Sequence, residues 1–336
     1  MTQSGRPPLV VAMGDPAGVG PEIVAKAWAQ RAERKLPPFV AVGDVRAVQR
    51  VWPGPVAPVL DLAQASEMFD LALPVLTVED AGEITPGQPD LEGARCALMS
   101  LEMAVGLARS GAARGLVTGP VSKSQLYKIG FTHPGQTEFV AERCGVSKSN
   151  AVMLLAGPTL RVVPITTHIP LAQVPGTLSV DLVLAKARAT VRGLRKNFGI
   201  AEPRLAFAGL NPHAGEDGAI GREEIDILEP AIAALRDEGV DVVGPLSADT
   251  MFHERARARY DVAICCYHDQ ALVPIKTLHF DDGVNFTLGL PIVRSSPDHG
   301  TAFPIAGRDQ AHPGAMIAAI AMAHEAAERR AASAST

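Results

Sequence analysis

At 336 residues, the chain exceeds the length at which one hydrophobic core usually keeps growing, which favours two domains or lobes. Its 47% hydrophobic and 20% charged residues fit a compact globular protein. The formal net charge of -5, with no block of consecutive basic residues, argues against nucleic acid and anionic membranes as partners. Without a signal-peptide pattern or a long apolar run, we predict a soluble, cytoplasmic protein.

The N-terminal part of the chain alternates between strand and helix patterns. A strand over 8–12 leads into the glycine-rich segment 13–22, MGDPAGVGPE, and a helix follows it, with Pro21 suited to the first turn. Further strands are predicted at 39–42, 59–62, 75–78 and 115–118, with a helix over 93–113. The glycine-rich segment matches neither GxGxxG nor GxxxxGK, so both a structural turn and an anion site at the helix start remain open.

Three apolar strands in the second part of the chain each run into a histidine. They are predicted at 160–165, 205–210 and 262–266, and the histidines are His168, His213 and His268. Parallel strands end along one edge of a sheet, so three imidazoles from separate strands can converge. Each histidine alone is more often structural. Together they favour a divalent metal site with an open position, which Asp249 and Asp269 could orient or complete.

Charged and hydrogen-bonding residues cluster downstream of the last of these strands. Lys276 and Arg294 are suited to a phosphate or carboxylate, and Arg294 is the better bidentate partner. An acidic protein that keeps such cations in a crevice is predicted to bind a small anionic substrate. In the segment Asp298-His299-Gly300-Thr301-Ala302, the glycine would let the backbone approach a flat cofactor.

Ordered motifs along nearly the full chain carry a resemblance to a known family. They are MGDPAGVGPE, TGPVSKS, PGQTEF, THIPL, GLNPHAGEDGAIGREE, SADTMF, YHDQ and DDGVNFTLGLPIVRSSPDHGTAF. In these motifs the chain resembles the PdxA family of 4-hydroxythreonine-4-phosphate dehydrogenases. The resemblance implies an α/β, two-lobed fold like that of isopropylmalate and isocitrate dehydrogenases, with mixed, largely parallel sheets and an interdomain cleft. We expect residues 1–130 plus about 283–336 to form the first lobe, and about 131–282 the second lobe with the histidines.

The same resemblance implies an activity. The family oxidises 4-phosphooxy-L-threonine at C3 with NAD, or with NADP, to 2-amino-3-oxo-4-phosphooxybutanoate. This product decarboxylates to 3-amino-2-oxopropyl phosphate in pyridoxal 5'-phosphate (vitamin B6) biosynthesis. The family is homodimeric and its active site draws on both chains, so the residues need not converge within one subunit.

The family's functional residues carry over to positions in this chain. The metal, expected to be zinc, magnesium or cobalt, is assigned to His168, His213 and His268. Substrate contacts are assigned to Gln136, Thr137, Lys276, Asn285 and Arg294, and cofactor contacts to Asp298, His299, Gly300, Thr301 and Ala302. Asp249, Asp269 and Lys276 are the candidates for proton transfer, and the sequence does not choose among them.

One position departs from the family pattern. Gln136 stands where the family usually has His before the Thr of its GHTEF motif, and Gln cannot become cationic. Other substrates of PdxA-like enzymes therefore remain open, namely D-threonate or D-erythronate 4-phosphate and aromatic cis-dihydrodiol carboxylates. A metallohydrolase and a catalytically silent sugar-phosphate binding protein are the further alternatives.

Overall fold

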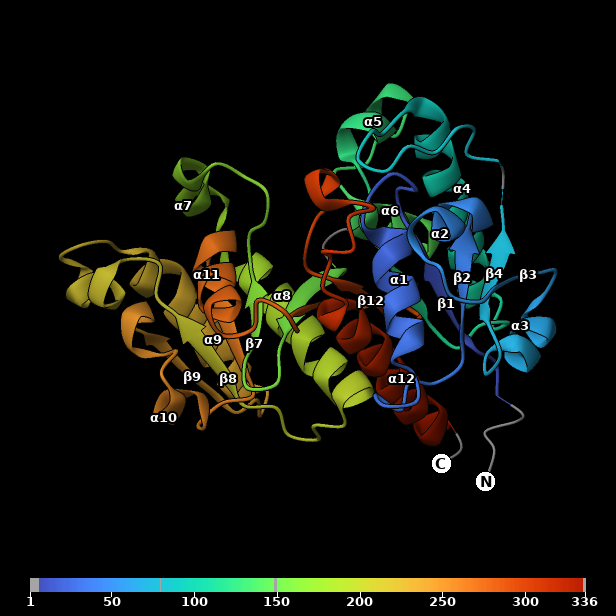
Figure 1. Cartoon of the computed structure of the whole chain (residues 1–336). Coiled ribbons are helices and arrows are strands. Elements are labelled where there is room, and N and C mark those ends of the chain that lie inside the picture. Colours follow the sequence, from blue (N-terminus) through green and yellow to red (C-terminus); the bar gives the residue numbers. More distant parts are fainter. Residues whose placement is uncertain (1–5, 79, 148–149, 335–336) are drawn as a thin grey trace. The chain divides into compact units, whose positions relative to one another are not determined.

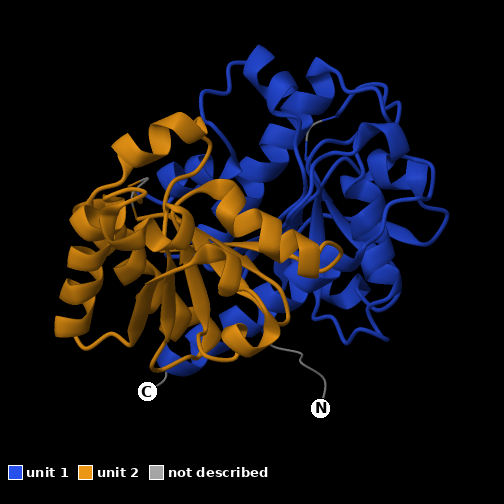
Figure 2. Ribbon diagram, turned by 90° about the vertical axis from the view of Figure 1, so that its left-hand side faces the viewer, with its two compact units in different colours: residues 1–145, 290–335 blue, residues 146–289, 336 orange. Residues whose placement is uncertain are grey.

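A computed structural model describes residues 6–78, 80–147 and 150–334. The chain divides into two compact units (Figure 1, Figure 2). Unit 1 contains residues 1–145 and 290–335, and unit 2 contains residues 146–289. Unit 2 is therefore inserted into the sequence of unit 1.

Unit 1 is built on a sheet whose described strands all pair in parallel. The strand order is β3-β4-β2-β1-β5-β12. The strands are β1 (Leu9–Ala12), β2 (Phe39–Gly43), β3 (Val56–Val59), β4 (Leu73–Thr77), β5 (Leu116–Thr118) and β12 (Arg294–Pro297). The central strands are buried along their whole length, as their continuous apolar sequences predict.

Helices connect the strands of unit 1. They are α1 (Gly20–Ala29), α2 (Val45–Val51), α3 (Leu62–Met68), α4 (Leu91–Arg109), α5 (Lys123–Lys128), α6 (Gln136–Arg143), the 3-10 turn η6 (Phe303–Ile305) and α12 (Gly314–Ala334). Helix α4 packs on β1 and β2, whereas α12 packs on β12, β5 and β1. Asp90 caps α4 because its carboxylate accepts from the Gly93 N–H at 2.7 Å.

Unit 2 has a mixed sheet in the order β11-β6-β7-β10-β8-β9. Its strands are β6 (Val152–Ala156), β7 (Arg161–Pro164), β8 (Leu205–Ala208), β9 (Val242–Leu246), β10 (Val262–Cys265) and β11 (Val284–Leu288). Strands β6 and β7 form an antiparallel hairpin, and β11 lies antiparallel to β6. Strands β7, β10, β8 and β9 are parallel, so β7, β10 and β8 end at one edge.

The helical segments of unit 2 follow these strands. They are η1 (Leu171–Gln173), α7 (Val174–Thr177), α8 (Val180–Gly193), η2 (Leu194–Phe198), η3 (Pro212–Gly218), η4 (Glu224–Leu228), α9 (Glu229–Asp237), η5 (Ala248–Thr250), α10 (Glu254–Arg257) and α11 (His268–Leu278). Helix α11 packs on β7 and β10, with Ala271, Leu272 and Ile275 buried. It begins at His268. The sequence pattern predicted polar residues at a strand end there, and no helix.

The predicted α/β class with largely parallel strands is confirmed. The structure places both unit boundaries later than the sequence-based division into 1–130 with about 283–336 and about 131–282. Helix α6 belongs to unit 1, and β11 belongs to unit 2 because it pairs with β6. Strand β3 ends at Val59 rather than starting there, since Asp61 caps α3 through the Gln64 N–H. Over the described residues, no helix has the length and apolarity needed to span a membrane.

Candidate active site

Two of the predicted metal ligands face each other in unit 2. His168 follows β7 and His268 opens α11 directly after β10, and their ring centroids lie 5.5 Å apart. Both line a cavity of about 220 Å³, together with Asp269, Tyr267, Thr166 and Leu171 among others. Because β7 and β10 are parallel neighbours, the sheet brings their two carboxyl ends, and hence the two histidines, together.

The histidine pair has a spacing that fits one metal ion. Two imidazoles bound to a single tetrahedral zinc ion place their ring centroids about 5 to 5.5 Å apart, given zinc–nitrogen bonds of about 2.0 to 2.1 Å. The Asp269 carboxylate lies 2.7 Å from His268 Nδ1, which leaves Nε2 as the ligand nitrogen. The donor types and the carboxylate behind one ring therefore fit a divalent ion.

His213, the third predicted ligand, lies after β8 on a left-handed turn. His213, Ala214, Glu216 and Asp217 all have positive φ within η3, at 50°, 52°, 45° and 52°. Non-glycine residues in this conformation cost roughly 1 to 2 kcal/mol each, so the surrounding structure must hold them. His213 is exposed. Among the described residues no group of three His, Cys, Asp or Glu is placed to hold a metal, so the three-histidine centre stays a prediction.

The other candidates in unit 2 lie on separate elements. Asp249 is exposed in η5 and accepts from the Ser247 hydroxyl at 2.6 Å. Lys276 is half-buried on α11, seven residues after Asp269, so both point from one face of the helix. On β11, the buried Asn285 Oδ1 has no hydrogen-bond donor among the described residues. A buried acceptor of this kind suits a ligand N–H or O–H.

In unit 1, a buried arginine and two threonines form a second group. Arg294 on β12 is 3% exposed and donates to Thr118 Oγ1 at 2.7 Å and to Thr137 Oγ1 at 3.2 Å. Burial lowers the pKa of Arg294 to about 10, and Glu138 opposes that fall. A buried guanidinium held by neutral hydroxyls is suited to an anion. Sequence reasoning missed Thr118, which lies 176 residues from Arg294.

The same group extends to the start of α6. Thr137 lies in the first turn of this helix, and Gln136 Nε2 donates to the Gly119 carbonyl at 3.0 Å. Lys123 lies beside Gly135, since a Cβ built on that glycine would stand 3.6 Å from Nζ. The Glu138 carboxylate lies on the same side, with Oε2 3.2 Å from that Cβ. The two cations, Arg294 and Lys123, together with the helix N-terminus outweigh this one negative charge and favour an anionic ligand here.

Loops at the carboxyl ends of β1, β5 and β12 meet at one edge of the unit 1 sheet. The Asp15 N–H donates to the Pro120 carbonyl, and the Val19 N–H donates to Thr301, each at 3.0 Å. A Cβ on Gly18 would stand 3.1 Å from the Thr301 oxygen. The predicted cofactor segment 298–302 therefore packs on the glycine-rich segment. Gly300 faces open space, and Ala302 has a left-handed backbone with φ 44°.

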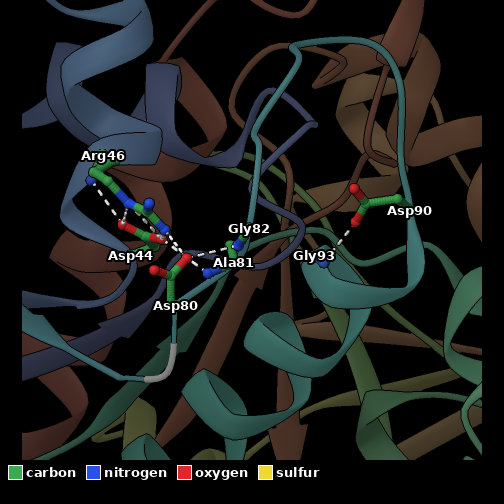
Figure 3. A network of polar contacts seen from close by, with 7 residues as sticks. All are labelled: Asp44, Arg46, Asp80, Ala81, Gly82, Asp90 and Gly93. Atoms are coloured by element: carbon green, nitrogen blue, oxygen red, sulfur yellow. Dashed lines mark hydrogen bonds and ion pairs between the residues drawn. The ribbon is translucent and has the colours of Figure 1, made fainter.

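Acidic residues at this edge also fix the neighbouring loops (Figure 3). Asp44, which follows β2, accepts from the N–H groups of Arg46 and Ala81, and the Arg46 guanidinium contacts both Asp44 and Asp80. Asp80 accepts from the Gly82 N–H at 2.7 Å. The cluster joins α2 to the loop after β4 and is satisfied within the chain, which identifies it as structural.

Asp15 in the glycine-rich segment is a buried carboxyl that sequence reasoning did not single out. It is 1% exposed and accepts from the Ala17 N–H at 3.0 Å. Burial raises its pKa to about 6; the Ala17 bond opposes the rise, and the charge of Asp90 adds to it. The folded protein therefore keeps the Asp15 proton to a higher pH than the unfolded chain does.

Replacement of Asp15 by asparagine is expected to stabilise the fold at pH 8. Because the pKa of Asp15 is raised in the folded protein, this carboxyl does not lower the free energy of unfolding below pH 3.8. The free energy of unfolding then falls as the pH rises through about 6. The pKa difference corresponds to about 3 kcal/mol, and Asn keeps the acceptor for Ala17. Urea unfolding at several pH values should show Asp15→Asn gaining on wild type between pH 4 and 7. Asp61→Asn, at the exposed cap of α3, is the control, and a pH-independent difference for Asp15→Asn would contradict the assignment.

Comparison with known proteins adds to this geometry. The family model described as pyridoxal phosphate biosynthetic protein PdxA matches residues 35–323. A 4-hydroxythreonine-4-phosphate dehydrogenase of Zymomonas mobilis is 56% identical over 323 residues, which cover 96% of each chain.

Solved structures are similar over nearly the whole chain. A 4-hydroxythreonine-4-phosphate dehydrogenase from Klebsiella pneumoniae matches with a TM-score of 0.84 and 36% identity, covering 97% of this chain and 99% of that one. A terephthalate 1,2-cis-dihydrodiol dehydrogenase from Burkholderia xenovorans matches with a TM-score of 0.65 and 32% identity, covering 95% and 98%. The two share this fold although their names specify different substrates.

Proposed function

Because the chain belongs to the PdxA family of pyridoxal phosphate biosynthetic proteins, we propose that it is a 4-hydroxythreonine-4-phosphate dehydrogenase. The C3 carbon of 4-phosphooxy-L-threonine would give its hydride to NAD or NADP, and the C3 hydroxyl would give up its proton. The resulting 2-amino-3-oxo-4-phosphooxybutanoate would lose carbon dioxide to form 3-amino-2-oxopropyl phosphate. The facing His168 and His268 pair, backed by Asp269, is the observation that most supports this chemistry.

His168, His213 and His268 are proposed to hold one divalent ion, of zinc, magnesium or cobalt. When bound, such an ion polarises a substrate oxygen and stabilises the negative charge left as carbon dioxide departs. Asp269 keeps the ring of His268 oriented, because its carboxylate accepts a hydrogen bond from the Nδ1–H of that ring. Because Nδ1 is hydrogen-bonded to the carboxylate, Nε2 is the ring nitrogen of His268 that points away from it.

The proton of the substrate hydroxyl needs an acceptor in the chain. Asp249, Asp269 and Lys276 are the candidates. Asp269 and Lys276 lie on one face of α11, and Asp269 lines the same cavity as the histidines. This placement favours α11 as the source of the base over Asp249 in η5, which does not line that cavity.

The anionic end of the substrate is proposed to bind the unit 1 group. Arg294 and Lys123 supply positive charge, Thr118 and Thr137 supply hydroxyls, and Gln136 supplies an amide. A phosphate group has several acceptor oxygens, so it can accept hydrogen bonds from several of these donors at once. Substrate contacts in unit 2 are proposed for Lys276 and for Asn285, whose buried oxygen would accept from a substrate ammonium or hydroxyl.

The nicotinamide cofactor is proposed to lie against residues 298–302. Gly300 leaves space for a flat group, and the Val19 N–H anchors the neighbouring Thr301 carbonyl. The left-handed backbone of Ala302 is the kind of local strain that accompanies binding loops.

A homodimer is proposed because unit 2 exposes large apolar side chains, one of which, Leu171, lines the cavity of His168 and His268. Leu171 is 64% exposed, Val273 63% and Phe280 79%. Apolar groups of this size usually become covered by a partner.

The proposed function is tested with phosphorylated hydroxy acids and NAD or NADP, by recording reduced-nicotinamide absorbance and released carbon dioxide. We expect turnover of 4-phosphooxy-L-threonine to require a divalent ion, and light scattering of the same sample to show a dimer. Preference for D-threonate 4-phosphate, D-erythronate 4-phosphate or a cis-dihydrodiol carboxylate would replace the substrate assignment. Phosphate release without reduction of the nicotinamide would identify a hydrolase.

Gln136→His is expected to improve use of 4-phosphooxy-L-threonine, chiefly through KM. A hydrogen bond from a charged donor contributes about 1.5 to 3 kcal/mol, whereas the Gln136 amide is neutral. kcat/KM should be measured for wild type and variant on this substrate and on D-threonate and D-erythronate 4-phosphates. Gln125→His is the matched control, because Gln125 is also half-buried and donates to a carbonyl, that of Pro89. Equal kcat/KM values on all three substrates would make Gln136 a neutral replacement.

A further inference from the structure

The left-handed turn that carries His213 is held by a buried carboxylate. Glu224, the first residue of η4, is 1% exposed. Its Oε1 accepts from the Asn211 N–H at 2.7 Å, and its Oε2 accepts from Asn211 Nδ2 at 2.9 Å. Asn211 immediately precedes η3, so both carboxylate oxygens fix the residue from which the turn starts.

Three glycines lie against this contact. A Cβ on Gly215 would stand 2.7 Å from Glu224 Oε2, and a Cβ on Gly209 would stand 3.2 Å from Oε1. A Cβ on Gly221 would stand 2.2 Å from Asn211 Nδ2. A side chain at any of these three positions would therefore crowd Asn211 or Glu224. The glycines let the backbone of the turn lie close to the carboxylate.

The contact needs a carboxylate rather than any polar group of the same shape. Asn211 offers two donors, so both partner oxygens must accept. A glutamine at 224 could accept only one of these hydrogen bonds, and its NH₂ group would face the other Asn211 donor. A buried mismatch of this kind would release Asn211, and with it the unfavourable positive-φ run from His213 to Asp217.

We infer that Glu224 is a positioning residue for the metal ligand His213, acting through Asn211 and the left-handed turn. The inference rests on the proposed metal site. Glu223 provides an internal comparison: its carboxylate also accepts from Asn211 Nδ2, at 2.7 Å, whereas the Asn211 N–H donates to Glu224 and Glu223 is only half-buried.

The test is Co²⁺ binding to the full-length, chelator-stripped protein, measured by calorimetry and by the visible spectrum of the bound ion. Wild type, Glu224→Gln, Glu223→Gln and His213→Ala are compared, together with the unfolding temperature of each metal-free protein. We expect Glu224→Gln to weaken Co²⁺ binding by about 10- to 100-fold and to change the spectrum. Glu223→Gln should stay within about threefold of wild type.

The outcomes separate this inference from the proposed function. If wild type binds Co²⁺ and His213→Ala loses it, but Glu224→Gln binds like wild type, the positioning role is wrong. A lower unfolding temperature for Glu224→Gln with unchanged affinity would show a purely structural role. If wild type does not bind Co²⁺, or His213→Ala binds it equally well, the metal assignment itself fails. If Glu224→Gln does not fold, Asn211→Ala is measured instead, because it removes the Nδ2 donor to Glu224. Unchanged Co²⁺ affinity of Asn211→Ala overturns the inference, and weaker Co²⁺ binding supports it.

Discussion

Arg294→Lys is expected to lower kcat/KM for the phosphorylated substrate by about 100-fold, equivalent to about 2.7 kcal/mol. The guanidinium reaches Thr118 and Thr137 at once, which fixes its plane and orients its positive charge for an anion. A lysine keeps the charge but offers a single nitrogen, so it cannot hold both hydroxyls and the ligand in one plane. Steady-state kinetics with 4-phosphooxy-L-threonine would measure the loss, most of which should appear in KM.

The control for this substitution is Arg143→Lys in α6. Arg143 pairs with Glu102 through both carboxylate oxygens but is 37% exposed, so its replacement should change kcat/KM by less than about threefold. Similar effects of the two substitutions would indicate a general loss of stability. An unaltered kcat/KM for Arg294→Lys would remove Arg294 from the anion site.

His268→Ala is expected to remove most of the bound metal and to lower kcat by about 1,000-fold or more, because the ion supplies several kcal/mol of charge stabilisation. The substitution also leaves Asp269 without its ring partner. Metal content by elemental analysis and kcat on the same preparation would test this. Asp269→Asn, which keeps the size but weakens the contact to Nδ1, should produce an intermediate loss.

His253→Ala serves as the control for the histidine variants. His253 caps α10 in the same unit by accepting from the Ala256 N–H, outside the cavity that His168 and His268 line. Its loss should leave metal content unchanged. Full activity of a metal-free His268→Ala protein would refute a metal-dependent mechanism.

Among the strands, the sequence predicted best those with continuous apolar runs. Continuous apolar runs such as Val262–Cys265 have few alternatives to a buried strand, so the order of strands and glycine-rich turns could be anticipated. Helix α11 was missed because its first turn is polar and Pro274 lies inside it. The helical spacing of Ala271, Leu272 and Ile275 was the available signal.

For the candidate site, local patterns were informative and distant pairs were not. Strand-end positions were enough to bring His168 and His268 together, because parallel neighbours share an edge. The Arg294 contact to Thr118 depends on the pairing of β12 with β5, which no local pattern specifies. Asp15 was hidden for the same reason, since its burial comes from loops after β5 and β12.

The insertion of unit 2 has a consequence for how the chain is made on the ribosome. Residues 1–145 emerge first, but β12 and α12, which complete the β5 side of their sheet and cover β1 and β5, are synthesised last. Residues 146–289 are contiguous, so strands β6 to β11 can pair with one another during translation. We expect the nascent N-terminal segment to expose apolar strand surface for most of synthesis, the condition under which chaperones are recruited.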